Sequence, residues 1–151
     1  MALAERAGLI GPGEGTTYPA SGARTTFKVR AEETQGMFEL TETSLPIRFG
    51  GPPPHVHGRI DHAFYVLEGE IEYQTGERMV RASAGSSVFV PHGVAHKFAN
   101  PAANPARMLQ IDSHGGREGM FKEMAAAFPP GSPLEPKLML EILQKYDTRP
   151  A

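Results

Sequence analysis

The sequence predicts an all-β sandwich or barrel with two α-helices at its C-terminal end. Short runs of alternating apolar and polar residues fill most of residues 24–114, and glycine or proline turns recur about every 8 to 12 residues, as is typical of sandwiches and barrels. The alternation then gives way to apolar residues at helical spacing. A chain of 151 residues has the size of one domain, so one core is expected.

Residues 1–23 have neither period and are rich in glycine, proline and threonine, which predicts an irregular N-terminal arm. The arm contains GPGEG, at positions 11–15, a run with some likeness to a phosphate loop. No Lys-Ser or Lys-Thr pair follows it, however, and Pro12 lacks the N–H group that a phosphate would use. We therefore interpret the run as a linker.

Short predicted strands make up the barrel of residues 24–114. Apolar and polar residues alternate around Phe27 and Val29 and again around Ile71 and Tyr73, so one face of each strand should be buried. The run GGPPP cannot be a central strand, because proline has no N–H for the ladder. In chain order the segments are TTFKVRA, GMFELTE, HVH, DHAFYVL, EIEYQ, RMVRA, SVFVP, HKFA and RMLQID.

Residues 115–151 are predicted to form a helical extension of the same domain. Two stretches place apolar residues at i, i+3, i+4 and i+7, and the run FPPGSP separates them because proline ends helices. We expect both helices to lie across the outside of the barrel or at a subunit interface, and we predict no chemistry in them. The apolar positions are Phe121, Met124, Ala125 and Phe128, then Met139, Ile142, Leu143 and Tyr146.

Composition excludes several classes of function. The net charge is only -2 and no long run has one sign, so neither nucleic acid nor a membrane surface is an expected partner. The absence of cysteine excludes disulfides, thiolate zinc sites and iron–sulfur clusters. The first residues have no basic segment or long apolar core, so no secretory signal is predicted and a cytoplasmic protein is expected.

Three histidines fall within the run HVHGRIDH. In an extended strand His55 and His57 point to the same side, because alternate residues share a face. If His62 faces inward on the next strand, Phe64 and Val66 do so too, and a short turn at residues 58–61 would put three imidazoles on one concave wall.

A fourth histidine follows the strand SVFV. The Pro-x-Gly turn after it should direct His96 back onto a neighbouring strand. Buried imidazoles need partners, and a cluster of them resists protonation, so a divalent cation would satisfy all four. His92 lies within the turn and His114 beside two glycines, and neither is expected to be a ligand.

These residues resemble the two motifs of the cupins, small jelly-roll β-barrels. The second motif, G-x5-P-x-G-x2-H-x3-N, is matched at every fixed position, and the likeness extends from Phe27 to Asp112. The end of the chain is similar to single-barrel cupins of the quercetin-dioxygenase-like type. The matching residues of the second motif are Gly85, Pro91, Gly93, His96 and Asn100.

The first motif, G-x5-H-x-H-x4-E-x6-G, is matched with two departures. His55, His57 and Gly69 are in register, but the leading glycine is displaced to residues 50–51 and the glutamate is replaced by His62. The resemblance implies one divalent transition-metal ion held by His55, His57, His62 and His96. Imidazole ligands do not distinguish iron, nickel, copper, zinc or manganese.

Replacing the glutamate leaves the site one unit more positive, which favours an anionic oxygen-chelating ligand. The resemblance then implies a dioxygenase for a small enolisable substrate of the flavonol or β-diketone type. No carboxylate replaces the missing base, because Asp61 should point away and Glu68 and Glu70 should be exposed. Arg59, at the tip of the turn, either meets an anion at the mouth or is a solvated turn residue.

Two other functions stay open: a non-catalytic metal-dependent module that binds a small molecule, and a metal-dependent isomerase or lyase. The missing base weakens the isomerase most. A homodimer is expected, since open cupin sheets tend to pair. The side chains predicted to line a substrate pocket fit plain barrel core better than substrate contact. They are Phe38, Leu40, Phe64, Val66, Val88, Val90, Phe98 and Met108.

Overall fold

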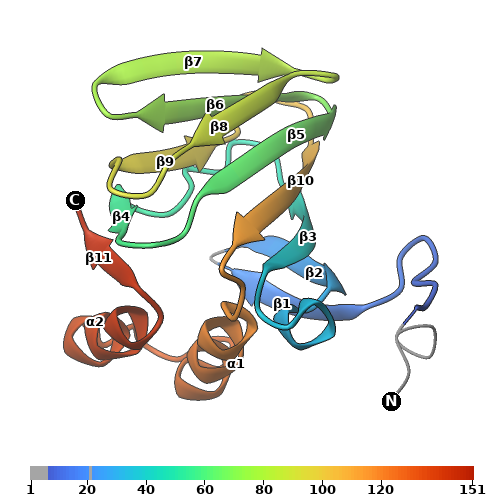
Figure 1. The fold of residues 1–151 in the computed structure, drawn as a ribbon. Helices are drawn as coiled ribbons and strands as arrows, with labels where there is room; N and C mark the ends of the chain where they lie inside the picture. The colour runs from blue at the N-terminus through green and yellow to red at the C-terminus, as the bar shows by residue number, and fades with distance from the viewer. Residues whose placement is uncertain (1–6, 21) are drawn as a thin grey trace.

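Two antiparallel β-sheets face each other in the computed structural model, which describes residues 7–20 and 22–151 (Figure 1). The six-stranded sheet has the order β1-β2-β3-β10-β5-β8 and the five-stranded sheet the order β11-β4-β9-β6-β7. This arrangement confirms the predicted all-β jelly roll. The strands are β1 Thr16–Ala20, β2 Ala23–Val29, β3 Phe38–Leu45, β4 His55–His57, β5 His62–Glu68, β6 Glu70–Thr75, β7 Arg78–Ser83, β8 Ser87–Val90, β9 His96–Ala99, β10 Ala106–Ser113 and β11 Thr148–Pro150.

The N-terminal segment is more regular than its sequence predicts. Residues Thr16–Ala20 form β1 and pair with β2, so the prediction of an irregular arm is wrong for these residues. The Tyr18 ring packs edge-on against Phe27, with 5.9 Å between ring centroids, and lies 6.3 Å from Phe121. The strand thus depends on contacts with distant segments, which local composition does not reveal. Residues 1–6 of the predicted arm lie outside the described residues.

Strand β3 presents the opposite face to the one predicted. Glu39, Thr41 and Thr43 are buried, whereas Phe38 is 38% exposed and Leu40 shares its outer face. Phe38 and Leu40 therefore do not line the interior. Alternation fixes the period of a strand but not its phase, and a one-residue shift exchanges the two faces. Here the polar residues are the inner ones.

The hydrophobic core fills one end of the space between the sheets. Of the side chains predicted to line the interior, Phe64, Val66, Val90 and Met108 are buried in this core. Val88 and Phe98 are partly buried and pack against it. The other buried members are Ala23, Leu45, Phe49, Ile71, Tyr73, Ala82 and Ala106.

The first cupin-like motif has its glycine displaced for a steric reason. Gly51 adopts φ +77°, and a Cβ atom there would lie 1.7 Å from the Phe98 carbonyl oxygen, so only glycine fits against β9. Phe49 is buried and bridges to Asn100. Position 49, where the motif has glycine, is therefore occupied in this chain by the buried side chain of Phe49.

Two helices follow the barrel, as predicted: α1 Glu118–Ala127 and α2 Pro136–Lys145. Figure 1 shows them together beneath the sheets, and α1 contacts β1 while α2 contacts β11. Strand β11 was not predicted; it pairs with β4, so that Thr148 lies opposite His57. Among the described residues, no helix combines the length and hydrophobicity needed to cross a bilayer.

Candidate metal centre

The four histidines of the predicted ligand set converge between the two sheets. His55 and His57 lie on β4, and His96 on β9 pairs directly with His55. His62 lies on β5 in the other sheet. The prediction that the first three would share one wall is thus wrong, because the turn at residues 58–61 crosses from one sheet to the other.

Three of the rings form the tightest group. One ring nitrogen from each of His55, His57 and His96 lies within 4.8 Å of those of the other two. His62 adjoins this group, with ring centroids 4.6 Å from His57 and 4.9 Å from His96, but its nitrogens do not lie within that distance of all three. The site is therefore a compact triad with a fourth imidazole beside it.

Each ring has its Nδ1 atom bonded to an oxygen of the protein. Nδ1 of His55 lies 3.0 Å from the Pro53 carbonyl oxygen, and Nδ1 of His57 lies 3.0 Å from that of Asp147. Nδ1 of His96 lies 2.9 Å from the Val94 carbonyl oxygen. A carbonyl only accepts, so Nδ1 carries the proton in these rings and Nε2 keeps its lone pair.

Burial keeps the rings of the triad neutral. Burial, together with the nearby His96, lowers the pKa of His55 to about 3. Burial and the charge of Arg117 lower the pKa of His57 to about 2. Burial also lowers the pKa of His96 to about 4, against a smaller upward effect of its bond to Val94. Neutral imidazoles are the form that binds a metal.

His62 differs from the other three because its partner is a carboxylate. Its Nδ1 donates to Asp112 Oδ1, and both side chains are almost completely buried. Arg117 Nη1 donates to the other oxygen of Asp112 at 2.6 Å, and Gln110 Nε2 donates to Oδ1 at 2.8 Å. Burial alone raises the pKa of Asp112, but the Arg117 and His62 charges hold it below its ordinary value.

Several residues around the histidines were not predicted from the sequence. Gln110 and Asp112 share the inner face of β10 with Met108, so polar residues at inward positions were the available signal. Asp147 and Thr148 lie 90 or more residues from His57 in the chain, and no local pattern pointed to them. The prediction of no chemistry concerned the two helices, and these supporting residues lie in the segment that follows α2.

The predicted orientation of Asp61 and the predicted exposure of His92, Glu68 and Glu70 are confirmed. Asp61 turns away and accepts hydrogen bonds from His92, whose side chain is exposed. His114 is exposed, and so are Glu68 and Glu70. Neither His92 nor His114 belongs to the cluster.

The donor set fits a transition-metal ion. His57 Nε2 is buried and has no hydrogen-bond partner among the described residues, which is an unfavourable state for a polar atom without a ligand. The oxygens bonded to Nδ1 would fix the ring orientations, as such partners do around bound metals. Nitrogen donors suit zinc, copper, iron and nickel.

Comparison with known proteins agrees with the observed fold. A family model described as a cupin domain matches residues 44–112, which include all four histidines. The resemblance to cupins is thus supported over residues 44–112. A search of curated proteins gives no match to this chain.

Solved structures of other cupin-fold proteins superpose well on this chain. A predicted oxalate decarboxylase from Thermotoga maritima matches with 18% identity and a TM-score of 0.65, over 70% of this chain and 98% of its own. The polyketide cyclase RemF from Streptomyces resistomycificus matches with 22% identity and a TM-score of 0.62, over 71% of this chain and 79% of its own. KdgF from Halomonas sp. matches with 17% identity and a TM-score of 0.63, over 75% of this chain and 98% of its own. At these identities the likeness shows the fold.

Proposed function

We propose that this protein binds one divalent transition-metal ion through His55, His57, His62 and His96, and binds a small oxygen-chelating substrate there as its anion. The observation that supports this most directly is the buried Nε2 of His57, which has no partner among the described residues, inside a cluster whose Nδ1 atoms are all bonded to protein oxygens. When bound, such an ion supplies Lewis acidity toward an enolate or similar oxygen anion.

The protein side chains around the cluster support an anionic substrate. Three neutral rings contribute no negative charge, and the nearest carboxylate, Asp112, is committed to His62, Gln110 and Arg117. A free carboxylate of the substrate or its enolate would therefore meet no repelling anion. Apolar side chains border the rings: the Phe64 centroid lies 5.4 Å from His62 and 6.0 Å from Phe98. These side chains would exclude water from the reacting group.

The reaction that we propose is dioxygenation of an enolisable substrate of the flavonol or β-diketone type. A dioxygenase places both atoms of O₂ in its product, so it needs no external reductant. Among the described residues, the carboxylate beside the rings, Asp112, is already paired, and a substrate that binds as its anion needs no separate base. The chain's own residues would orient the anion and keep the site dry.

A second candidate is a reaction of the same anion without O₂, as in an isomerase or lyase. RemF, whose name identifies it as a polyketide cyclase, has this fold, and polyketides carry enolisable carbonyl groups. A module that binds the small molecule without converting it is the remaining alternative. The three functions share the metal centre and differ in what happens to the substrate.

Metal content tests the centre itself. We expect the purified protein to contain about one transition-metal ion per chain by elemental analysis, and the His96→Ala and His57→Ala variants to lose it. His62→Ala tests the fourth ligand, and His92→Ala is the matched control because its ring is exposed. Full retention in His57→Ala and His96→Ala would reject the metal centre.

Oxygen consumption tests the reaction. With flavonols and β-diketones, a dioxygenase should consume O₂ in step with substrate loss, and His96→Ala should not. Substrate loss without O₂ consumption would favour the isomerase or lyase. Saturable binding without turnover, with each of iron, nickel, copper, zinc and manganese restored in turn, would favour the binding module.

A further inference from the structure

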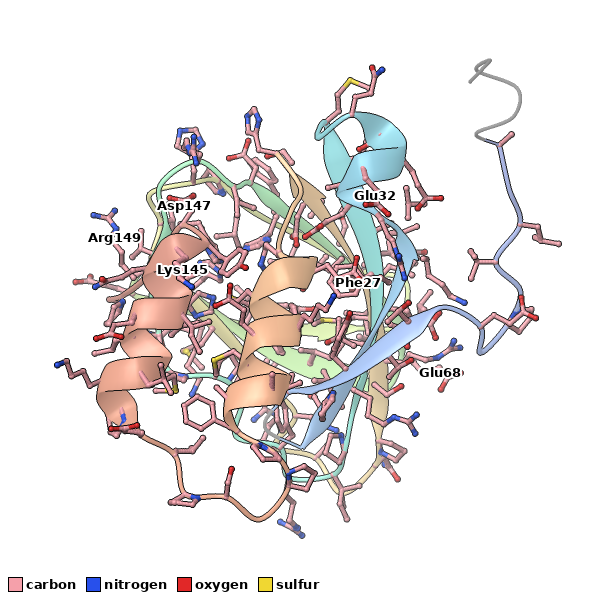
Figure 2. All side chains as sticks on the ribbon, turned by 90° about the horizontal axis from the view of Figure 1, so that it is seen from below. Phe27, Glu32, Glu68, Lys145, Asp147 and Arg149 are labelled. Atoms are coloured by element: carbon pink, nitrogen blue, oxygen red, sulfur yellow. The ribbon has the colours of Figure 1, made fainter. Side chains whose placement is uncertain are left out.

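A cleft separate from the histidine cluster lies where the turn after β4, the segment before α1 and the end of α2 meet. Its volume is about 410 Å³, and its lining includes Arg59, His114, Arg117, Lys145 and Asp147 but none of the four clustered histidines. Figure 2 shows Lys145 and Asp147 at the same end of α2. Pockets of this size accommodate small molecules.

The cleft is lined by more positive than negative charge. Arg59, Arg117 and Lys145 contribute three cations, and Asp147 is the one carboxylate in the lining. Both oxygens of Asp147 already accept backbone hydrogen bonds, from Gly58 N at 3.1 Å and from Arg59 N at 2.7 Å. The turn therefore holds the carboxylate in place, and the three cations of the lining still outnumber this one negative charge.

Among the described residues, Arg117 and Lys145 have side-chain partners and the Arg59 guanidinium has none. Within residues 7–20 and 22–151, no carboxylate or carbonyl group accepts a hydrogen bond from the Arg59 guanidinium. Lys145 Nζ pairs with Glu123 Oε2 at 2.9 Å, but both side chains are exposed and such pairs exchange at little cost. The Arg59 side chain is thus open to a ligand, and Lys145 can exchange Glu123 for one.

Arg117 is a fixed part of this cleft. Its side chain is only 12% exposed, lines the cleft and donates through Nη1 to Asp112. The backbone N–H groups of Gly116 and Arg117 are not free, because Glu39 accepts both, at 2.9 and 3.1 Å. The side chains, and not the start of α1, therefore provide the positive surface.

We propose that this cleft binds a small oxyanion, a carboxylate or a phosphate, through Arg59 and Lys145 beside the fixed charge of Arg117. A guanidinium and an ammonium group match such oxygens, and arginine can bind two of them at once. This site does not depend on the proposed metal centre. It is connected to that centre, however, because Arg117 contacts Asp112, which in turn holds His62.

The test is titration of the full-length ¹⁵N-labelled protein with inorganic phosphate and, separately, with succinate, followed by amide chemical shifts. We expect saturable shifts at Arg59 and at residues 115–117, extending through Arg117 to Asp112. Saturation by one anion and not the other identifies the source of the ligand. Changes centred on His55 and His96 would place the anion at the metal centre and reject the proposal.

Charge-reversal variants complete the experiment. Arg59→Glu should weaken binding at least tenfold, whereas Arg149→Glu should change it less than twofold. Arg149 is a suitable control because it is exposed and does not line the cleft (Figure 2). Both positions are on the surface, so both variants should fold, which circular dichroism can verify. Equal weakening in the two variants, or no saturation in the native protein, would overturn the proposal.

Discussion

The two ends of the space between the sheets use the same strands for opposite purposes. Strand β5 carries Val66 into the apolar core at one end and His62 into the histidine cluster at the other. Strand β10 does the same with Met108 and Asp112. A continuous inner face thus changes from apolar to polar along its length.

The difference between these ends lies in what burial requires. At the apolar end, Leu45 and Ile71 are buried without polar partners and stabilise the fold simply by leaving water. At the histidine end, each buried group needs a partner, and the chain His62, Asp112, Arg117 shows how far such partners extend. Burial at the apolar end therefore stabilises the fold, whereas burial of polar groups at the histidine end has a free-energy cost that their partners offset.

The largest effect is expected from a substitution in the apolar core. Leu45→Ala removes a side chain that is 1% exposed, and we expect the free energy of unfolding to fall by about 2–5 kcal/mol in urea denaturation. Metal content, measured by elemental analysis, should stay unchanged because no ligand is altered. The control is Leu134→Ala, which removes an exposed leucine and should change stability by less than about 0.5 kcal/mol. A loss of metal in Leu45→Ala would show that the two ends are not independent.

The next effect is expected at the carboxylate of the polar end. Asp112→Asn keeps the shape but removes the negative charge that His62 contacts, and such partners contribute about 10- to 100-fold to metal affinity. We expect a decrease of this size in Co²⁺ affinity, with a change in the visible spectrum of the bound ion. Circular dichroism should accompany the measurement, because the variant leaves Arg117 without its anionic partner.

The exposed pair of Asp61 and His92 provides a matched control for this variant. Their closest atoms are 2.7 Å apart, as in a buried pair, but both side chains face solvent. Asp61→Asn should leave the Co²⁺ affinity within a factor of two. Equal losses in Asp112→Asn and Asp61→Asn would show that the loss does not arise at the cluster.

The smallest expected effect is a loss of stability of the metal-free protein as the pH falls. The ordinary pKa of histidine is 6.5, whereas burial holds the pKa of His57 at about 2 and that of His96 at about 4. Below pH 6.5 the unfolded state therefore binds more protons than the folded state, so stability is complete above that pH and falls as the pH decreases. For each ring the loss is about 1.4 kcal/mol per pH unit.

Urea denaturation between about pH 5 and pH 6.5 measures this slope directly. Replacing His57 with glutamine should reduce the slope by about 1.4 kcal/mol per pH unit, and bound metal should suppress it because coordination blocks protonation. An unchanged slope in His57→Gln would mean that the ring is protonated in the folded protein.

Sequence predicted the element types well because local patterns carry that information. The alternation in residues 24–114 and the spacing of Phe121 and Met124 identified strands and helices correctly. The phase of β3 was predicted wrongly, since Glu39, Thr41 and Thr43 read as outward-facing residues until their partners are known. Strand β1 was missed because its pairing is long-range.

In the candidate site, too, the sequence predicted some residues and not others. His55, His57, His62 and His96 were all identified from motif spacing, and the structure brings them together. Their supporting atoms were not identified, because Asp147 and Asp112 come from segments 90 and 50 residues away from His57 and His62. A motif records residue types at short separation, and these contacts exist only after the sheets have closed.

Taken alone, the sequence determined that this protein is a β-barrel with helical residues after it, and that four imidazoles stand where related barrels hold an ion. The element types follow from period and spacing, which neighbouring residues set, and the ion site follows from the resemblance to the cupin motifs. Only the tertiary structure decided that the four rings meet across two sheets, that Asp112 and Arg117 support one of them, and that a cationic cleft adjoins Arg117. Each of these depends on the approach of segments distant in the chain, which no local pattern encodes.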